Sequence, residues 1–223
     1  MLRIYITDVS NLIDSDGDSE LWTGIKAVLC KERLKRHEAL KNNPKGRALN
    51  AGAGALLTYV LCKPNVPKTA DGILTELTPT ELMSTKNSCE ISLTLQTEII
   101  VNAHGKPEFP ADRGLPHFNI SHSGTKAVLA VSDKEVGIDI QEIRPVRGAK
   151  VSDRFFTEKE KRLAGSDTNA FYGLWTRKEA YGKCLGTGLM PVMDTDVSGP
   201  APEGFEIMDF ELPDYRISVC LKK

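Results

Sequence analysis

The sequence predicts an α+β fold, because two kinds of segment recur along it. Some segments alternate β-branched with polar residues, which is typical of strands, and longer ones carry apolar residues at helical spacing. About midway along the chain, residues 103–116 form a turn-rich connection with two glycines and three prolines. We therefore expect two halves, residues 1–110 and 111–223.

The first half begins with a strand pattern at Leu2–Val9. Apolar residues at helical spacing then predict a helix over 21–40, and an alanine- and leucine-rich segment predicts a second one over 45–62. Thr78 and Pro79 are suited to the N-cap and first position of a short helix. Residues 90–101 complete this half with a further strand pattern.

Composition excludes several classes of protein. The 223 residues carry a formal net charge of −1, so no global charge favours nucleic acid or an anionic membrane, and an anionic ligand must be held by a local group of bases. The five cysteines form no CxxC pair, which argues against a disulfide framework or a structural zinc site and favours a cytoplasmic location. No apolar run reaches the roughly 18 residues of a membrane span.

One such group of bases occurs between residues 31 and 47. It contains seven basic residues opposed only by Glu32 and Glu38, namely Lys31, Arg33, Lys35, Arg36, Lys41, Lys45 and Arg47. A solvated helix face is the ordinary explanation of such a run. A site for a phosphate-rich ligand is the alternative.

The second half contains a strand pattern that ends in the turn Ser121–Gly124. His122, at the end of this strand, is placed to donate a hydrogen bond to a phosphate oxygen, particularly when it is protonated. A turn histidine bonded to the backbone is the structural alternative.

The next strand, 136–141, sets Asp139 between two isoleucines. Period-two alternation places Ile138 and Ile140 on one face and Gly137, Asp139 and Gln141 on the other. A carboxylate in so apolar a strand needs a compensating partner, either a divalent cation or a basic side chain. Gly137 would let a neighbouring group approach the backbone closely.

Two helices follow. Thr157 and Glu160 have the spacing of a capping box, which explains both residues without a catalytic role for Glu160. The second helix, 171–184, is expected to end at Gly186 as a glycine C-cap. Within it, Glu179 and Lys183 are four residues apart and share a face, either as a surface ion pair or as a metal-binding carboxylate beside a phosphate-binding lysine.

The order and spacing of these segments over about 90 residues resemble the 4′-phosphopantetheinyl transferases of the Sfp type. The resemblance is carried by GKPEF at 105–109, FNISHS at 118–123, VGIDI at 136–140, RFFTEKE at 154–160 and WTRKEAYGK at 175–183. It implies a pseudo-two-fold α+β monomer made of two similar halves, with coenzyme A in the cleft between them. The implied reaction transfers the 4′-phosphopantetheine moiety to a serine of an apo acyl or peptidyl carrier protein and releases adenosine 3′,5′-bisphosphate.

The resemblance also implies roles for individual residues. Mg²⁺ would be held by Asp139 and Glu179, and Lys183 would stabilise charge on the transferred group, with Lys178 assisting. The phosphates and the 3′-phosphoadenosine end of coenzyme A would be bound by Lys35, Arg47, Lys106, Ser121 and His122. The predicted catalytic residues are thus Glu179, Lys183 and Asp139.

Gln141 departs from the family pattern, which often has a second acidic residue at this position. Because an amide oxygen is still a ligand suited to Mg²⁺, we expect Gln141 to join Asp139 and Glu179 at a metal site of lower negative charge. Two other functions would use similar residues, a metal-dependent pyrophosphate hydrolase and a non-catalytic module that binds coenzyme A or a carrier protein.

Overall fold

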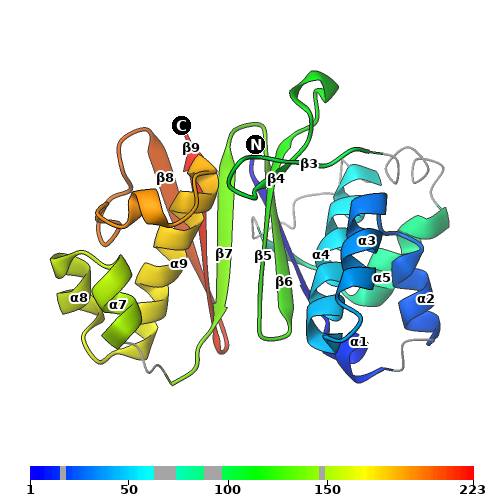
Figure 1. The fold of residues 1–223 in the computed structure, drawn as a ribbon, viewed down its shortest axis with the longest axis horizontal. Coiled ribbons are helices and arrows are strands. Elements are labelled where there is room, and N and C mark those ends of the chain that lie inside the picture. The colour runs from blue at the N-terminus through cyan, green and yellow to red at the C-terminus, as the bar shows by residue number, and fades with distance from the viewer. Residues whose placement is uncertain (16–18, 63–73, 88–96, 146–148) are drawn as a thin grey trace.

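The protein combines mainly antiparallel sheets with helices that pack on their faces (Figure 1). The computed structural model describes residues 1–15, 19–62, 74–87, 97–145 and 149–223. This mixture of helices and sheets confirms the predicted α+β class. No helix in these described ranges combines the length and the apolar character needed to cross a bilayer.

The first sheet has the strand order β2-β1-β6-β5. Its strands are β2 (Leu74–Glu76), β1 (Arg3–Asp8), β6 (Lys126–Ser132) and β5 (His117–Ser123). The pairs β1–β6 and β6–β5 are antiparallel, whereas β1–β2 is parallel. The strand predicted at 90–101 lies mostly outside the described residues, apart from the two-residue strand β3 (Ile100–Val101).

Five helices cover one face of this sheet (Figure 1). They are α1 (Ser10–Asp14), α2 (Glu20–Lys26), α3 (Lys31–Ala39), α4 (Pro44–Cys62) and α5 (Pro79–Met83), and the turn η1 (Ser84–Asn87) follows the last of them. The long helix α4 is buried along most of its length. The cap that was predicted for α5 is present, with Thr78 and Glu81 forming a capping box.

The single helix predicted over 21–40 is wrong, because the chain breaks between α2 and α3. Val28, Leu29 and Cys30 at the break are all buried, and three consecutive residues would span about 200° of a helix, more than the apolar stripe of a surface helix covers. The Thr58 hydroxyl donates to the Val28 carbonyl oxygen at 2.6 Å and thereby satisfies a backbone group that the break leaves without a helical partner.

A second sheet has the order β7-β9-β8 and is antiparallel throughout. Its strands are β7 (Val136–Glu142), β9 (Tyr215–Lys222) and β8 (Phe205–Leu212). The helix α9 (Thr168–Leu185) packs on this sheet, and α7 (Ala149–Phe155) and α8 (Glu158–Ala164) pack beside it (Figure 1). The turn η3 (Met190–Val192) lies between α9 and β8.

The two sheets meet where β5 runs beside β7, and side chains rather than a backbone ladder join them. Asn119 Oδ1 accepts a hydrogen bond from the Ile138 N–H at 2.9 Å, and Ser123 Oγ accepts one from the Glu142 N–H at 3.0 Å. Apolar residues of both sheets, including Ile138, form one buried cluster. Because β5 and β6 pair with β1, the chain passes from the first sheet to the second between β6 and β7. The division into halves 1–110 and 111–223 remains a prediction.

Short elements precede β5 in the chain. The strands β3 and β4 (Pro107–Glu108) form a small hairpin, followed by the turn η2 (Ala111–Arg113). The hairpin contacts the end of α9, because Asn102 Nδ2 donates to the Gly186 carbonyl oxygen at 3.1 Å. As predicted, Gly186 ends α9 in the left-handed conformation, with φ of 70°.

Candidate active site

A cavity of about 630 Å³ lies where α3, α4, the β3–β4 hairpin, β5, β7 and α9 face one another. This volume is within the range of small-molecule sites. The cavity brings together seven residues that the sequence analysis selected, namely Lys106, Ser121, His122, Asp139, Gln141, Glu179 and Lys183.

Asp139 is buried and has three hydrogen-bond donors around its carboxylate. Lys183 Nζ lies 2.6 Å and Ser121 Oγ 2.7 Å from Oδ1, and Gln141 Nε2 lies 3.0 Å from Oδ2. Its exposed fraction is 2%, so these donors compensate a charge that has little contact with water. The basic partner that the strand pattern allowed for Asp139 is thus Lys183.

Glu179 faces the same cavity but forms no hydrogen bond or ion pair with any described residue. Burial raises the pKa of this carboxyl above its ordinary value, and the negative charge of Asp139 raises it further, while Lys183 acts in the opposite direction. Among the described residues, Glu179 therefore has no cationic side chain within ion-pair distance.

Glycine at position 137 lets α9 approach β7 closely enough to place these groups. A side chain there would collide with the backbone of Ala180, which follows Glu179 in α9, and with that of Cys184, about one turn farther along the helix. The polar face of β7 that carries Asp139 and Gln141 therefore lies directly under the helix, as the period-two pattern predicted.

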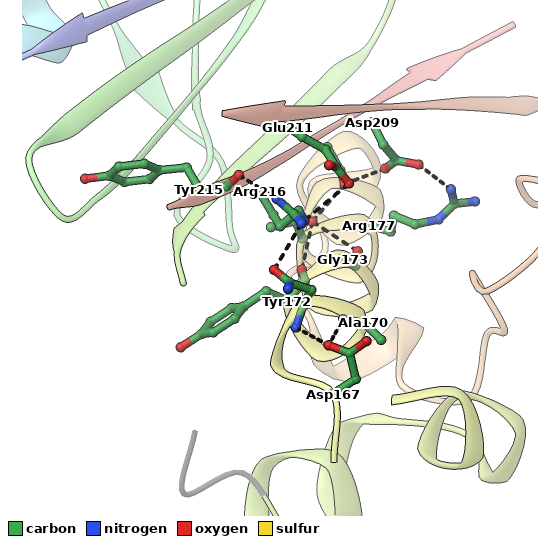
Figure 2. A network of polar contacts seen from close by, with 12 residues as sticks. Asp167, Ala170, Tyr172, Gly173, Arg177, Asp209, Glu211, Tyr215 and Arg216 are labelled. Atoms are coloured by element: carbon green, nitrogen blue, oxygen red, sulfur yellow. Dashed lines mark hydrogen bonds and ion pairs between the residues drawn. The ribbon is translucent and has the colours of Figure 1, made fainter. Parts of the chain in front are cut away.

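Polar contacts on the side of α9 that faces β8 and β9 hold the helix in this position (Figure 2). Arg177 Nη1 donates to Asp209 Oδ2 at 2.6 Å, and Ser218 Oγ donates to Asp209 Oδ1 at 2.7 Å. Near the start of the helix, Arg216 Nη2 donates to Asn169 Oδ1 at 3.0 Å, and Asp167 caps the first turn. These bonds tie α9 to β8 and β9.

The donor set fits a hard divalent cation. Asp139 and Glu179 supply two carboxylates at one cavity, and Mg²⁺ is usually held by one or two carboxylates together with substrate phosphates and water. Within the described residues there is no group of three or more His, Cys, Asp or Glu side chains that could form an all-protein cage. Gln141 directs its NH₂ group, not its oxygen, toward Asp139.

His122 lies farther along the cavity, where its side chain is exposed to solvent. Although the ring reaches solvent through the cavity, the protein atoms around it partly desolvate the ring and lower its pKa, and the positive charges of Lys183, Arg36 and Arg33 lower it further. Three cationic side chains are therefore near enough to disfavour protonation of the imidazole, as expected at a place that receives an anion.

Two arginines of α3 form the basic end of the cavity. Arg33 is buried, with Nη1 3.3 Å from Asn50 Oδ1 and Nε in an ion pair 3.4 Å from Glu32 Oε2, while Arg36 is exposed and lines the cavity. The sequence analysis named both only as members of the basic run. Their spacing of three residues, with Leu40 four residues later, is a sequence signal that would have placed them on one face of the helix.

Comparison with known proteins agrees with this site. Residues 135–221, which contain Asp139, Glu179 and Lys183, match the sequence model described as the 4′-phosphopantetheinyl transferase superfamily. This part of the chain, less than half of its length, is therefore similar to that superfamily.

Individual relatives carry the same name. The chain is 36% identical over 140 residues to a 4′-phosphopantetheinyl transferase of Bacillus subtilis, a match that covers 54% of this chain and 61% of that one. It is 33% identical to the 4′-phosphopantetheinyl transferase psf-1 of Bacillus pumilus, over 56% of this chain and 62% of that one. It is also 33% identical to the 4′-phosphopantetheinyl transferase AcpT of Salmonella typhimurium, over 55% and 66%. The chain thus spans less than two thirds of the length of each of these relatives.

Lys35 and Arg47, the two bases that the superfamily resemblance suggested for phosphate binding, lie outside the cavity lining. Lys35 is on the exposed side of α3. The Arg47 guanidinium stacks on the Trp22 ring at 5.3 Å and lies 3.0 Å from His37 Nε2. For Lys35 the helix register explains the difference, because positions 33 and 36 of α3 face the cavity and position 35 does not.

Lys106 and Lys178, two further predicted ligand contacts, direct their ammonium groups to protein partners. Lys106 lines the cavity, but Nζ donates to Glu135 Oε2 at 2.7 Å. Lys178 is completely buried and donates to Glu160 Oε2 at 2.6 Å and to the Met193 carbonyl oxygen at 2.8 Å. It lies outside the cavity lining.

Proposed function

We propose that this protein transfers the 4′-phosphopantetheine arm of coenzyme A to a serine hydroxyl of an apo carrier protein. This proposal rests on the distribution of charged side chains in the cavity. Arg33 and Arg36 provide positive charge at one end, and the Asp139–Glu179 pair with Lys183 lies at the other. A ligand with separated phosphate groups, such as coenzyme A, matches both ends. The names of the relatives support the same reaction.

In this proposal the 3′-phosphate lies at the α3 end, near His122, and the diphosphate lies at the β7–α9 end. Asp139 and Glu179 would hold Mg²⁺ there, and Gln141 would keep Asp139 oriented through its amide. The bound cation would neutralise charge on the diphosphate. Lys106 would act mainly by fixing the β3–β4 hairpin, since its ammonium is engaged by Glu135.

The reaction forms a bond between the serine oxygen and the β-phosphorus and breaks the bond from that phosphorus to the bridging oxygen. Adenosine 3′,5′-bisphosphate leaves, and the serine proton is released. Such transfer depends mainly on positioning and on compensation of phosphate charge. Lys183 Nζ, which faces the cavity, is suited to donate to the bridging oxygen as the bond breaks. Glu160 is unsuited to accept the proton, because both of its carboxylate oxygens accept hydrogen bonds inside the protein.

Intact-mass spectrometry tests the reaction. Several apo acyl and peptidyl carrier proteins are incubated with coenzyme A, Mg²⁺ and this protein, and one carrier is expected to gain one phosphopantetheine. Release of phosphopantetheine without an acceptor would instead indicate a pyrophosphate hydrolase. Coenzyme A binding without either product would indicate a non-catalytic binding module.

We also propose that the protein acts as a monomer in the cytoplasm. The four cysteines in the described part of the chain are free thiols, which suits a reducing compartment. Size-exclusion chromatography with light scattering tests the oligomeric state.

A further inference from the structure

Lys183 has two roles that compete. Its ammonium lies 2.6 Å from Asp139 Oδ1 and 3.0 Å from Ser121 Oγ, so it is bonded to the β strands that form the cavity wall. The proposed reaction needs the same ammonium at a phosphate oxygen of the ligand. It also needs Asp139 at a divalent cation.

Charge makes the two partners of Asp139 compete. The carboxylate carries one negative charge, it is buried, and the Lys183 ammonium compensates it. A divalent cation on the same carboxylate would lie within a few ångströms of that ammonium, and like charges at such short range repel strongly where water is scarce. Glu179 has no described partner and attracts the cation toward the same place.

The side chains around Asp139 differ in how easily they can leave. Lys183 has an exposed fraction of 27% and stands in the last turn of α9, so its flexible stem can swing into the cavity. Ser121 and Gln141 are neutral and would remain bonded to Asp139 after the lysine departs. Asp139 would thus keep its orientation while its carboxylate becomes free to bind the cation.

We propose that a divalent cation displaces Lys183 from Asp139 and that this exchange frees the ammonium to bind a phosphate group in the cavity. The destination of the ammonium rests on the proposed function. The exchange itself involves only the protein and the cation, so it is testable without coenzyme A or a carrier protein.

The first experiment measures Mn²⁺ binding by electron paramagnetic resonance on the wild-type protein and on Lys183→Met. Loss of the competing ammonium is expected to tighten Mn²⁺ binding about tenfold, the factor that corresponds to about 1.4 kcal/mol. Lys126→Met is the matched control, because Lys126 pairs with Asp8 at 3.0 Å outside the cavity and is similarly shielded. Its Mn²⁺ affinity should equal that of the wild type. Equal or weaker binding by Lys183→Met, or no binding by either protein, would overturn the proposal.

The second experiment uses the wild-type protein only, so it does not depend on the folding of a variant. Lysines are acetylated briefly with acetic anhydride, with and without Mn²⁺, and each site is quantified by peptide mass spectrometry. Labelling of Lys183 is expected to rise severalfold when the cation is present, whereas labelling of Lys126 should not change. Constant or reduced labelling of Lys183 would contradict the exchange.

These results separate the exchange from the proposed function. A protein that shows the Mn²⁺ effects but modifies no carrier would keep the exchange and lose the transferase assignment. A protein that modifies a carrier but shows neither effect would keep the assignment and lose the exchange.

Discussion

Glu160 and Lys178 form an ion pair in which Oε2 and Nζ lie 2.6 Å apart and both side chains are completely buried. The pair also secures the segment after α9, because Glu160 Oε1 accepts from the Val197 N–H at 2.9 Å and Lys178 donates to the Met193 carbonyl oxygen. Glu160 closes the capping box of α8 as well. One carboxylate and one ammonium therefore join α8, α9 and the connection to β8.

Lys178→Met should destabilise the protein by about 3–5 kcal/mol, because it leaves the Glu160 charge buried and unpaired. Urea denaturation monitored by circular dichroism gives the free energy of unfolding. Lys159→Met is the control, since Lys159 pairs with Asp196 at an exposed position, and it should cost less than about 1 kcal/mol. Similar values for the two variants would show that the buried pair is not a major contact.

Glu179→Gln should stabilise the protein at neutral pH. Because the folded state raises the pKa of this carboxyl, the folded protein binds more protons than the unfolded chain once the pH exceeds the ordinary value of 4.5. The contribution of Glu179 to stability therefore falls as the pH rises from that value through the raised pKa. Thermal unfolding at several pH values should show a gain for Glu179→Gln at about pH 7.5 that disappears near about pH 4. A gain of equal size at both pH values would point to packing rather than to ionisation.

The sequence was sufficient to predict which side chains of β7 and α9 line the cavity. Alternation in β7 assigned Asp139 to the polar face, and the four-residue spacing in α9 assigned Glu179 and Lys183 to one side of the helix. Both rules concern neighbours within one element, so they do not depend on tertiary packing. The structure added what lies between elements, in particular that Lys183 contacts Asp139 rather than Glu179.

The sequence was less informative about side-chain contacts that depend on how the helices are arranged in space. Lys178 and Lys183 are both lysines near Glu179, but only the position of α8 shows that Lys178 points into a buried pair. The basic run between 31 and 47 likewise offered seven candidates with similar chemistry. The break between α2 and α3 fixes which side of α3 faces the cavity, and that break was missed.

Coenzyme A binding should be coupled to proton uptake by His122. The low pKa of this ring follows from its enclosure and from the neighbouring cations, so the folded protein loses stability as the pH falls from the ordinary value of 6.5 through the lowered one. A bound phosphate would offset those positive charges and raise the pKa. Calorimetric titrations near about pH 6 in two buffers of different ionisation enthalpy should reveal the uptake, and His122→Gln should abolish most of it. Equal uptake in that variant would assign the proton to another group.

Arg36→Ala should weaken coenzyme A binding by about tenfold to a hundredfold, the range expected for loss of a hydrogen bond to a charged group. Lys35→Ala is the adjacent control, because Lys35 lies outside the cavity lining, and the affinity of this variant for coenzyme A should stay close to that of the wild type.

Calorimetry with coenzyme A and with 3′-dephospho-coenzyme A shows which phosphate Arg36 contacts. If Arg36 binds the 3′-phosphate, the difference between Arg36→Ala and the wild type should largely vanish for the dephosphorylated ligand. A loss that persists with this ligand would place Arg36 at the diphosphate instead, and a larger loss in Lys35→Ala would show that the opposite face of α3 binds the ligand.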